Sequence, residues 1–409
     1  ASTWILETHE DTWMRAGLDQ SNEAETVAYF EDMFREELEG HKLLSNKSIW
    51  RNFPVVSNQN WYHENVVLIG DAAHTAQFSI GSGTKIAMEG AISLLKSIEE
   101  EGSISSALTE YQEKREIEIS RLQRSAMVSL QWYENARRYN DLTPPQYAFN
   151  FLSRSKSVTY ENLKLRDVRY GREVNSWYAN LVRKEQGFDI PDDPAPPPMF
   201  TPYRLRDLVF QNRVVVSPMC QYSANDGTPT DWHLVHLGGF AVGGAGLVYA
   251  EMTNVSAAGR ITPGCAGMYK PEHVEAWKRV TSFIHQNSRA KICIQLAHAG
   301  RKGSTKYPWH GEDEPLENGN WPLISASPLP YKEFNQVPKE MTRDDMDDVL
   351  DSFVRAARMA EEAEFDMIEI HMAHGYLLSS FISPVSNVRR DEYGGELVNR
   401  LKFPVEILK

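Results

Sequence analysis

The sequence has little that would suit a secreted, membrane-bound or nucleic-acid-binding protein. It has three cysteines in 409 residues and no Cys-x-x-Cys pair, which excludes a disulfide framework and a thiolate zinc site and favours a reducing compartment. No apolar run approaches the ~20 residues of a membrane span, and acidic residues near the N-terminus do not suit a signal peptide. The formal charge of -13, from 43 Lys and Arg against 56 Asp and Glu, disfavours nucleic acid and anionic membranes as partners. We therefore expect a soluble, cytoplasmic protein.

The clearest domain boundary is a proline-rich segment near the middle of the chain. Five prolines within residues 191–198 forbid a continuing helix and favour an extended spacer. We predict an upstream domain at 1–190, a linker at 191–198 and a downstream domain at 199–409. A chain of this length is also long enough for two domains, each with its own buried core.

The upstream domain is predicted to be rich in helix. Apolar periodicity indicates helices at Glu23–Glu39 and Gly90–Arg138. Between them, Val66–Ile69 is a short apolar strand candidate that ends in a Gly-Asp pair, which is typical of a strand followed by a turn.

The downstream domain is predicted to alternate strands with helices. Strands are expected at Arg213–Ser217, Gly246–Glu251, Lys291–Leu296 and Asp366–His371. A helix is expected at Met346–Ala363, with Thr342 and Asp345 forming its N-terminal capping box. The first two intervals, of ~31 residues each, suit the β/α units of a (β/α)8 barrel, and a Gly- and Pro-rich insertion at 300–338 lengthens the third.

Four strands make only half of such a barrel, since eight are needed to leave no open edge. The fold class is therefore α/β, with about half of a (β/α)8 TIM barrel in the downstream domain. We expect the chain to be a piece of a longer protein.

The upstream domain contains one motif with chemical content, Gly70-Asp71-Ala72-Ala73-His74 followed by Gly81-Ser82-Gly83-Thr84. An acid after a strand can accept hydrogen bonds from a polyol, and glycines at a helix start let backbone N–H groups approach an electron-rich ligand. His74 is open to two interpretations, contact with a ligand or a structural role.

This motif resembles the second FAD motif of the para-hydroxybenzoate hydroxylase-like flavin monooxygenases. The resemblance implies that the Gly70 turn places Asp71 on the ribityl chain of FAD. It also implies that four residues lie against the pyrimidine edge of the isoalloxazine: Gly81, Ser82, Gly83 and Thr84. Thr3–Asp19 resembles a strand of the substrate-binding sheet of the same family. No GxGxxG segment is present, so we expect the chain to hold only the C-terminal part of such a domain and an incomplete FAD site.

The downstream domain carries the stronger signal, because polar motifs follow the predicted strands in order. They are Ser217–Tyr222, Trp232–His233, Gly243–Gly246, Gln295–Lys302, His371–Tyr376 and Asp391–Gly395. Together they resemble the Old Yellow Enzyme family of FMN ene-reductases, in the subgroup with a cysteine after the first strand. The match covers about the first half of that family's barrel.

Three of these residues suit the reduction of an activated alkene. Hydride addition to the β-carbon develops negative charge on the substrate carbonyl, and His371 and His374, three residues apart at a strand end, can donate hydrogen bonds to it. Tyr376 is the candidate proton donor to the α-carbon, because a phenol holds its proton at neutral pH.

The resemblance assigns the cofactor contacts. It implies that Gln295 hydrogen-bonds the flavin pyrimidine and that Pro218, Met219 and Ala250 line the ring. Cys220 would lie against the flavin and tune its potential. The residues that bind the FMN phosphate have no counterpart before the end of the chain.

Other interpretations remain open for several of these residues. The histidine pair could ligate zinc, although no third ligand is evident, and Cys220 could be a small buried hydrophobe. Arg301 and Lys302 could face substrate or solvent. Packing or loop-orienting roles are expected for the remaining candidates, His233, His236, Trp232 and Tyr393.

A hydroxylase part joined to a barrel reductase resembles the bipartite 2-aminobenzoyl-CoA monooxygenase/reductases and the related salicylyl-CoA 5-hydroxylase group. That resemblance implies FAD, FMN and NAD(P)H as cofactors, hydroxylation of an aromatic acyl-CoA with O2 at FAD, and reduction of the dearomatised product at FMN. We expect a homodimer. Two alternatives stay open, an FMN ene or dienoyl-thioester reductase with an inert hydroxylase part, and a non-catalytic scaffold that binds a CoA ester.

A local excess of basic residues is consistent with such a substrate. Residues 137–172 contain eight basic residues and three acids, in a chain that is acidic overall. The segment is either a solvated face or a site for a polyanion such as the nucleotide of coenzyme A.

Overall fold

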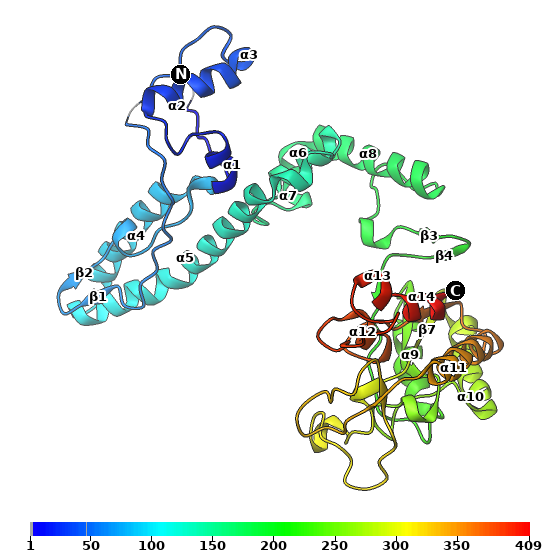
Figure 1. The fold of residues 1–409 in the computed structure, drawn as a ribbon. Coiled ribbons are helices and arrows are strands. Elements are labelled where there is room, and N and C mark those ends of the chain that lie inside the picture. Colours follow the sequence, from blue (N-terminus) through cyan, green and yellow to red (C-terminus); the bar gives the residue numbers. More distant parts are fainter. Residues whose placement is uncertain (1–2, 46) are drawn as a thin grey trace. The chain divides into compact units, whose positions relative to one another are not determined.

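The computed structural model describes residues 3–45 and 47–409, and these form two compact units. The first unit runs to Tyr178 and includes Asp192–Pro194. The second contains Ala179–Pro191 and Ala195–Lys409. Figure 1 colours the chain along its length.

The division therefore falls inside a helix rather than at the prolines. Residues 179–190, which the sequence assigned to the upstream domain, belong to the second unit. Contacts to the following strand explain this, because the Gln186 side chain accepts a hydrogen bond from the backbone N–H of Arg204 at 2.7 Å. The guanidinium of Arg204 also lies 5.2 Å from the ring centroid of Phe188.

The first unit is mostly helical, as predicted. Its helices are α1 (Glu10–Arg15), α2 (Glu23–Met33), α3 (Arg35–Leu38), α4 (Gly83–Glu100), α5 (Ile104–Glu134), α6 (Pro144–Leu152), α7 (Tyr160–Arg166) and most of α8 (Val168–Gln186). Its strands are β1 (Tyr62–His63) and β2 (Val66–Val67), which form an antiparallel pair.

The long helix predicted at 90–138 is two helices, α4 and α5. The chain breaks at Gly102 and restarts at Ser103, whose hydroxyl caps α5 by accepting the N–H of Ser106 at 3.1 Å. The two helices lie side by side in Figure 1 and enclose a small core that includes Ile86 and Tyr111.

The segment expected to supply a strand at 3–19 does not contain one. Residues 3–9 have no regular structure and α1 follows them. Glu10 and Asp11 in the first turn and Arg15 in the last match the dipole of a helix, which explains the local preference.

The second unit has the alternating order that the sequence predicts. Its strands are β3 (Tyr203–Leu205), β4 (Leu208–Phe210), β5 (Val215–Val216), β6 (Leu247–Asn254), β7 (Lys291–Ala297), β8 (Ile324–Ser325), β9 (Lys339–Glu340) and β10 (Met367–Ile370). Its helices are α9 (Asp231–Val242), α10 (Pro271–Asn287), α11 (Arg343–Glu362), α12 (Leu377–Ile382), α13 (Leu397–Arg400) and α14 (Lys402–Leu408).

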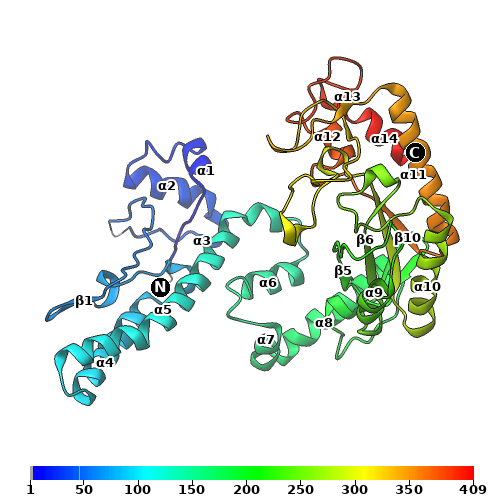
Figure 2. The same cartoon turned by 90° about the horizontal axis from the view of Figure 1, so that it is seen from below.

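Four of these strands form one parallel sheet, in the order β10-β7-β6-β5. They are the four strands predicted from the sequence. Along the chain, α9 follows β5, α10 follows β6 and α11 follows β7. Figure 2 shows the strands running together, with α10 and α11 along one side. The repeated β/α unit agrees with the predicted half of a (β/α)8 barrel. None of the described helices is both long and apolar enough to cross a lipid bilayer.

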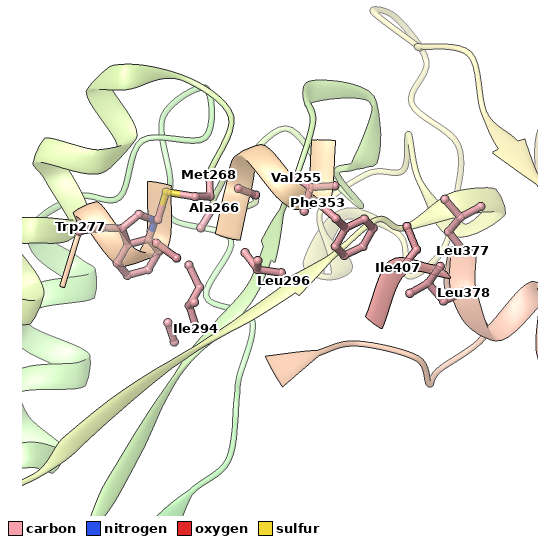
Figure 3. Close-up of a cluster of buried hydrophobic side chains, with 14 of the residues drawn as sticks. Val255, Ala266, Met268, Trp277, Ile294, Leu296, Phe353, Leu377, Leu378 and Ile407 are labelled. Carbon is pink, nitrogen blue, oxygen red and sulfur yellow. The ribbon is translucent and has the colours of Figure 1, made fainter. Parts of the chain in front are cut away.

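Alternate residues of β7 separate the two faces of this sheet. Ile292, Ile294 and Leu296 point into a large core under the helices, where Figure 3 shows Trp277, Ile294 and Leu296 among other buried side chains. Cys293 lies in a different cluster with Phe210 of the β3–β4 hairpin. A strand exposes successive side chains on opposite faces, so the second face is free to carry the polar residues of a site.

The predicted capping of α11 is also found. The Thr342 hydroxyl accepts the N–H of Asp345 at 3.2 Å, and the Asp345 carboxylate accepts the N–H of Thr342 at 2.7 Å. The capping box thereby satisfies the backbone N–H groups of Thr342 and Asp345.

The core under the helices gives a stability prediction. Trp277 is fully buried, and its indole N–H donates to the carbonyl of Gly267 at 3.1 Å. Trp277→Ala should lower the free energy of unfolding by about 3–5 kcal/mol, since it leaves a cavity and an unpaired carbonyl. Denaturant unfolding measures this. Trp309→Ala is the control, because that ring is 62% exposed, and an equal loss there would contradict the assignment of the core.

Candidate active site

Side chains from four strand ends meet at one edge of the parallel sheet. Cys220 follows β5, Met252 and Ala297 lie near the ends of β6 and β7, and Tyr376 follows β10. All four belong to one apolar cluster, in which Cys220 and Tyr376 are partly buried. Parallel strands present their carboxyl ends at the same edge, so the sheet brings together residues that are far apart in sequence.

The predicted histidine pair forms a directed hydrogen-bond relay. His371 Nδ1 accepts the backbone N–H of Ala373 at 3.1 Å, so the proton of the neutral ring is on Nε2. That Nε2 lies 3.0 Å from His374 Nδ1 and donates to it. Burial, with His374 beside it, lowers the pKa of His371 to about 4 and keeps the ring neutral. The relay leaves His374 with its N–H on Nε2.

A tight turn folds Tyr376 back over these histidines. His374 and Gly375 have φ of +56° and +74°, in the left-handed region. For the histidine this conformation costs about 1–2 kcal/mol, which the surrounding contacts must offset. The rings of His371 and Tyr376 meet edge to face with centroids 5.0 Å apart. The turn thus gathers the three predicted catalytic residues.

The phenol of Tyr376 lies in surroundings that keep it protonated. Burial raises its pKa above the usual value, and the nearby Cys220 thiol acts in the same direction. Burial likewise raises the pKa of Cys220. Cys220 is therefore a thiol at neutral pH, which suits a packing or tuning role better than a nucleophilic one.

Gln295 is fixed on the face of the sheet opposite the helices. Its side-chain amide donates to the Glu369 carboxylate at 2.6 Å, between residues that are paired across β7 and β10. Tyr249 of β6 hydrogen-bonds the same carboxylate, and burial raises the pKa of its phenol. Glu369 and Tyr249 were not identified from the sequence. The period-two alternation of the strands could have placed them on this face.

A bulge in β6 changes which residue faces the site. The pairing of β6 with β7 shifts between Tyr249 and Met252. Ala250, expected beside the flavin ring, lies in the core under the helices, on the same face as Val248 two residues before it. Met252 takes the position next to Cys220. The structure does not bring Ala250 to the site, and a bulge of one residue has no clear sequence signal.

A buried histidine and carboxylate support the loop that carries Cys220. His233 Nδ1 accepts the N–H of Thr230 at 3.0 Å, and its Nε2 donates to Glu251 at 2.8 Å. The other Glu251 oxygen accepts the backbone N–H of Gln221 at 2.9 Å. The loop-orienting role expected for His233 agrees with these contacts.

The same segment matches a known family. Residues 198–409, just over half of the chain, match the NADH:flavin oxidoreductase / NADH oxidase family. The chain belongs to this family.

Curated relatives match over the same part of the chain. An NADH:flavin oxidoreductase of Gibberella zeae is 46% identical over 215 residues, which is 51% of this chain and 52% of that protein. An NADPH dehydrogenase of a Geobacillus species is 43% identical over 212 residues, or 51% and 58% of the two chains. The chain therefore spans a little over half the length of these relatives.

Solved structures give similar coverage. Morphinone reductase is 26% identical, with a TM-score of 0.47, over 52% of this chain and 57% of that one. The Old Yellow Enzyme of a Pichia species is 29% identical, with a TM-score of 0.46, over 52% and 55%.

The residues at the strand ends of the second unit fit an FMN ring. Pro218 and Met219 come directly after β5, and Met219 is 42% exposed. Cys220, which follows them, packs in one apolar cluster with Met252, and Met252 is paired with Gln295 across β6 and β7. An isoalloxazine has apolar faces and a polar pyrimidine edge, so this combination of residues suits it.

The two parts of the upstream motif, the turn after Ile69 and the start of α4, lie close together, although they do not make a complete flavin site. The turn at Gly70–Ala72 follows β2, and α4 begins at Gly83, directly after the Gly81-Ser82 pair. A Cβ atom added to Gly70 would lie 3.4 Å from the Cβ of Ala87 on α4, so the turn and the first part of this helix are close.

The remaining residues of this motif differ in their exposure to solvent. Asp71 and Thr84 are exposed, and Ser82 makes no side-chain capping bond to α4. His74 is buried against Trp61, and burial lowers its pKa.

The zinc interpretation of the histidine pair finds no support in the geometry. The facing nitrogens of His371 and His374 are engaged with each other. Among the described residues, no three metal-ligating side chains lie together.

A second buried histidine fixes the turn above the site. His298 Nδ1 accepts the N–H of Gly300 at 3.0 Å, and its carbonyl accepts the N–H of Leu377 at 3.0 Å. Burial lowers the pKa of His298 to about 4. The turn at Gly300–Lys302 is thereby tied to the start of α12.

This histidine makes stability depend on pH. Its folded pKa is below the usual 6.5, so its contribution is complete above pH 6.5 and is lost as the pH falls toward 4, by up to about 3 kcal/mol. His298→Gln should therefore lose less stability between pH 7 and 4.5 than the native protein. Urea unfolding at both values measures this, with exposed His310→Gln as the control. Parallel pH dependences in native and His298→Gln protein would contradict the prediction.

Proposed function

We propose that the second unit is an NAD(P)H-dependent FMN oxidoreductase that reduces alkenes activated by a carbonyl group. The observation that carries the proposal is the assembly of His371, His374 and Tyr376 at the carboxyl edge of the sheet in a chain of this family. The chain spans only part of the length of its relatives, so its enzymatic activity is part of what we propose.

The histidine relay would bind the substrate carbonyl. The Nε2–H of His374 is the donor left by the relay, and the neutral state of His371 fixes its direction. A preorganised donor stabilises the negative charge that develops on the carbonyl oxygen during the reaction. His371 stays neutral in this arrangement, so it does not have to lose a proton before it donates to His374.

Tyr376 would supply the proton that completes the reduction. Bound FMN supplies the chemistry of two-electron transfer from NAD(P)H to the alkene. The raised pKa of Tyr376 keeps the phenol protonated until the α-carbon accepts that proton. Gln295 would hold the pyrimidine edge, while Pro218, Met219 and Cys220 would line the ring.

The Tyr376 assignment gives a kinetic prediction. Tyr376→Phe removes the proton donor and keeps the ring, so enone reduction should slow by about 10²–10⁴ while flavin reduction by NADPH stays within about twofold. Stopped-flow absorbance separates the two half-reactions. An unchanged rate of enone reduction would remove Tyr376 from this role.

The first unit supports a second candidate function. Gly70, Asp71 and the start of α4 lie together in a turn-and-helix arrangement that suits a flavin contact. We infer an FAD-dependent hydroxylase part, which would act on an aromatic acyl-CoA with O2, so that the FMN part reduces the oxygenated product.

Several basic side chains in residues 137–172 are already engaged in contacts within the protein, which leaves fewer of them to bind the nucleotide of coenzyme A. Arg154 is not available, since its Nε donates to Ser129 at 3.1 Å and its guanidinium lies 4.3 Å from the Phe151 ring centroid. Arg169 pairs with Glu173 at 3.0 Å. Exposed Arg137, Arg138 and Arg166 remain as candidates. The homodimer and the cytoplasmic location stay predictions.

Flavin content separates these functions. We expect one FMN and one FAD per chain of the full-length protein after extraction and chromatography. FMN alone would leave the reductase and exclude the hydroxylase. The absence of both flavins would contradict each proposal and favour the CoA-ester scaffold.

A further inference from the structure

Two cations stand beside the candidate active site without a carboxylate partner. Arg301 and Lys302 follow Gly300 in the turn that His298 fixes. Among the residues that the structure describes, no Asp or Glu forms an ion pair with either of them. Neighbouring cations are paired, because Lys332 lies 3.0 Å from Asp313 and Lys306 lies 3.0 Å from Glu314.

Lys302 is close to the candidate proton donor. Its ammonium lies 5.4 Å from the ring centroid of Tyr376 and 4.3 Å from that of Tyr331. It donates only a long bond of 3.4 Å, to the carbonyl of His374. An ammonium has three donors, so Lys302 retains hydrogen-bonding capacity next to the substrate position.

Arg301 adds a second unsatisfied group. Its Nε is buried and has no hydrogen-bond partner among the described residues. Its Nη1 donates weakly to the carbonyl of Pro330 at 3.3 Å, and its guanidinium lies 5.8 Å from the Tyr331 ring centroid. Arg301 as a whole is only partly buried, and its unpaired donor and positive charge favour an anion nearby.

We propose that Arg301, Lys302 and Tyr331 form an anion subsite beside Tyr376. The subsite binds the carboxylate or phosphate oxygens of a substrate while the alkene lies at the histidine relay. This inference rests on the proposed reductase function and narrows it to substrates that carry a negative charge. Cations on a preorganised turn suit oxyanions, since charge-assisted hydrogen bonds are about twice as strong as neutral ones.

Two sources could supply such oxygens, the alkene substrate or the phosphates of NADPH. A matched pair of probes tests the first, 3-oxocyclohex-1-ene-1-carboxylate and its carboxamide, which differ in charge and little in shape. In Lys302→Met the kcat/KM for the carboxylate, relative to that for the carboxamide, should fall about tenfold. The KM of Lys302→Met for NADPH, measured with the carboxamide as the alkene substrate, tests whether the phosphates of NADPH are the source.

A matched control separates local charge from packing. Lys332→Met removes a lysine that lies 5.8 Å from the same Tyr331 ring but is paired with Asp313. We expect its carboxylate-to-carboxamide ratio to stay within about twofold of native. Lys302→Arg should restore most of the ratio, because it restores the charge. Titration calorimetry of the FMN-loaded protein with the carboxylate should show the same loss of affinity in Lys302→Met.

The outcomes distinguish the subsite from the function on which it rests. A fall in the carboxylate ratio, or a raised KM for NADPH, supports the subsite and identifies its source. Unchanged values for both probes and for the dissociation constant would overturn it. A native protein that binds FMN but reduces neither probe would instead contradict the proposed reductase, while calorimetry would still report on the subsite.

Discussion

The parallel pairing of β7 with β6 and β10 is the interaction on which the candidate site depends. It sets Gln295 opposite Glu369 and places the turn that bears His371 and Tyr376 beside the loop that bears Cys220. The pairing is stabilised from the other face, where the apolar residues of β7 pack beneath the helices. Burial of that face therefore holds the polar edge in place, since a slip of one residue would exchange the two faces.

Burial also determines the chemistry that the edge can perform. Desolvation lowers the pKa of His371 and His298 and raises that of Tyr376. The same cause therefore keeps two bases neutral and one acid protonated. A site of neutral donors suits the stabilisation of a developing negative charge. Arg301 and Lys302 are the exception, since neither has a carboxylate partner in the part of the chain that the structure describes, and they lie at the turn above the relay rather than within it.

The sequence predicted the four strands of the sheet, the capping of α11 and the grouping of the histidine pair with Tyr376, because each leaves a local signal of periodicity or spacing. It failed where a local signal was overlooked and where a contact between separate segments decides the outcome. The break between α4 and α5 follows from a single cap at Ser103, and residues 179–190 join the second unit through Gln186. The segment expected to supply a strand at 3–19 contains α1 instead.

The sequence by itself determined the family, the order of strands and helices in the second unit and the identity of the polar residues at the strand ends. Only the tertiary structure decided which of those residues meet. The bulge in β6 pairs Met252 rather than Glu251 with Gln295 and places Met252 in the cluster of Cys220, and the sequence carries no signal of such a bulge. The tautomers of the histidine relay depend on backbone donors positioned by the turn, and the partners of Gln295 depend on strand register. These are long-range properties, because they arise from packing between segments rather than from any one segment.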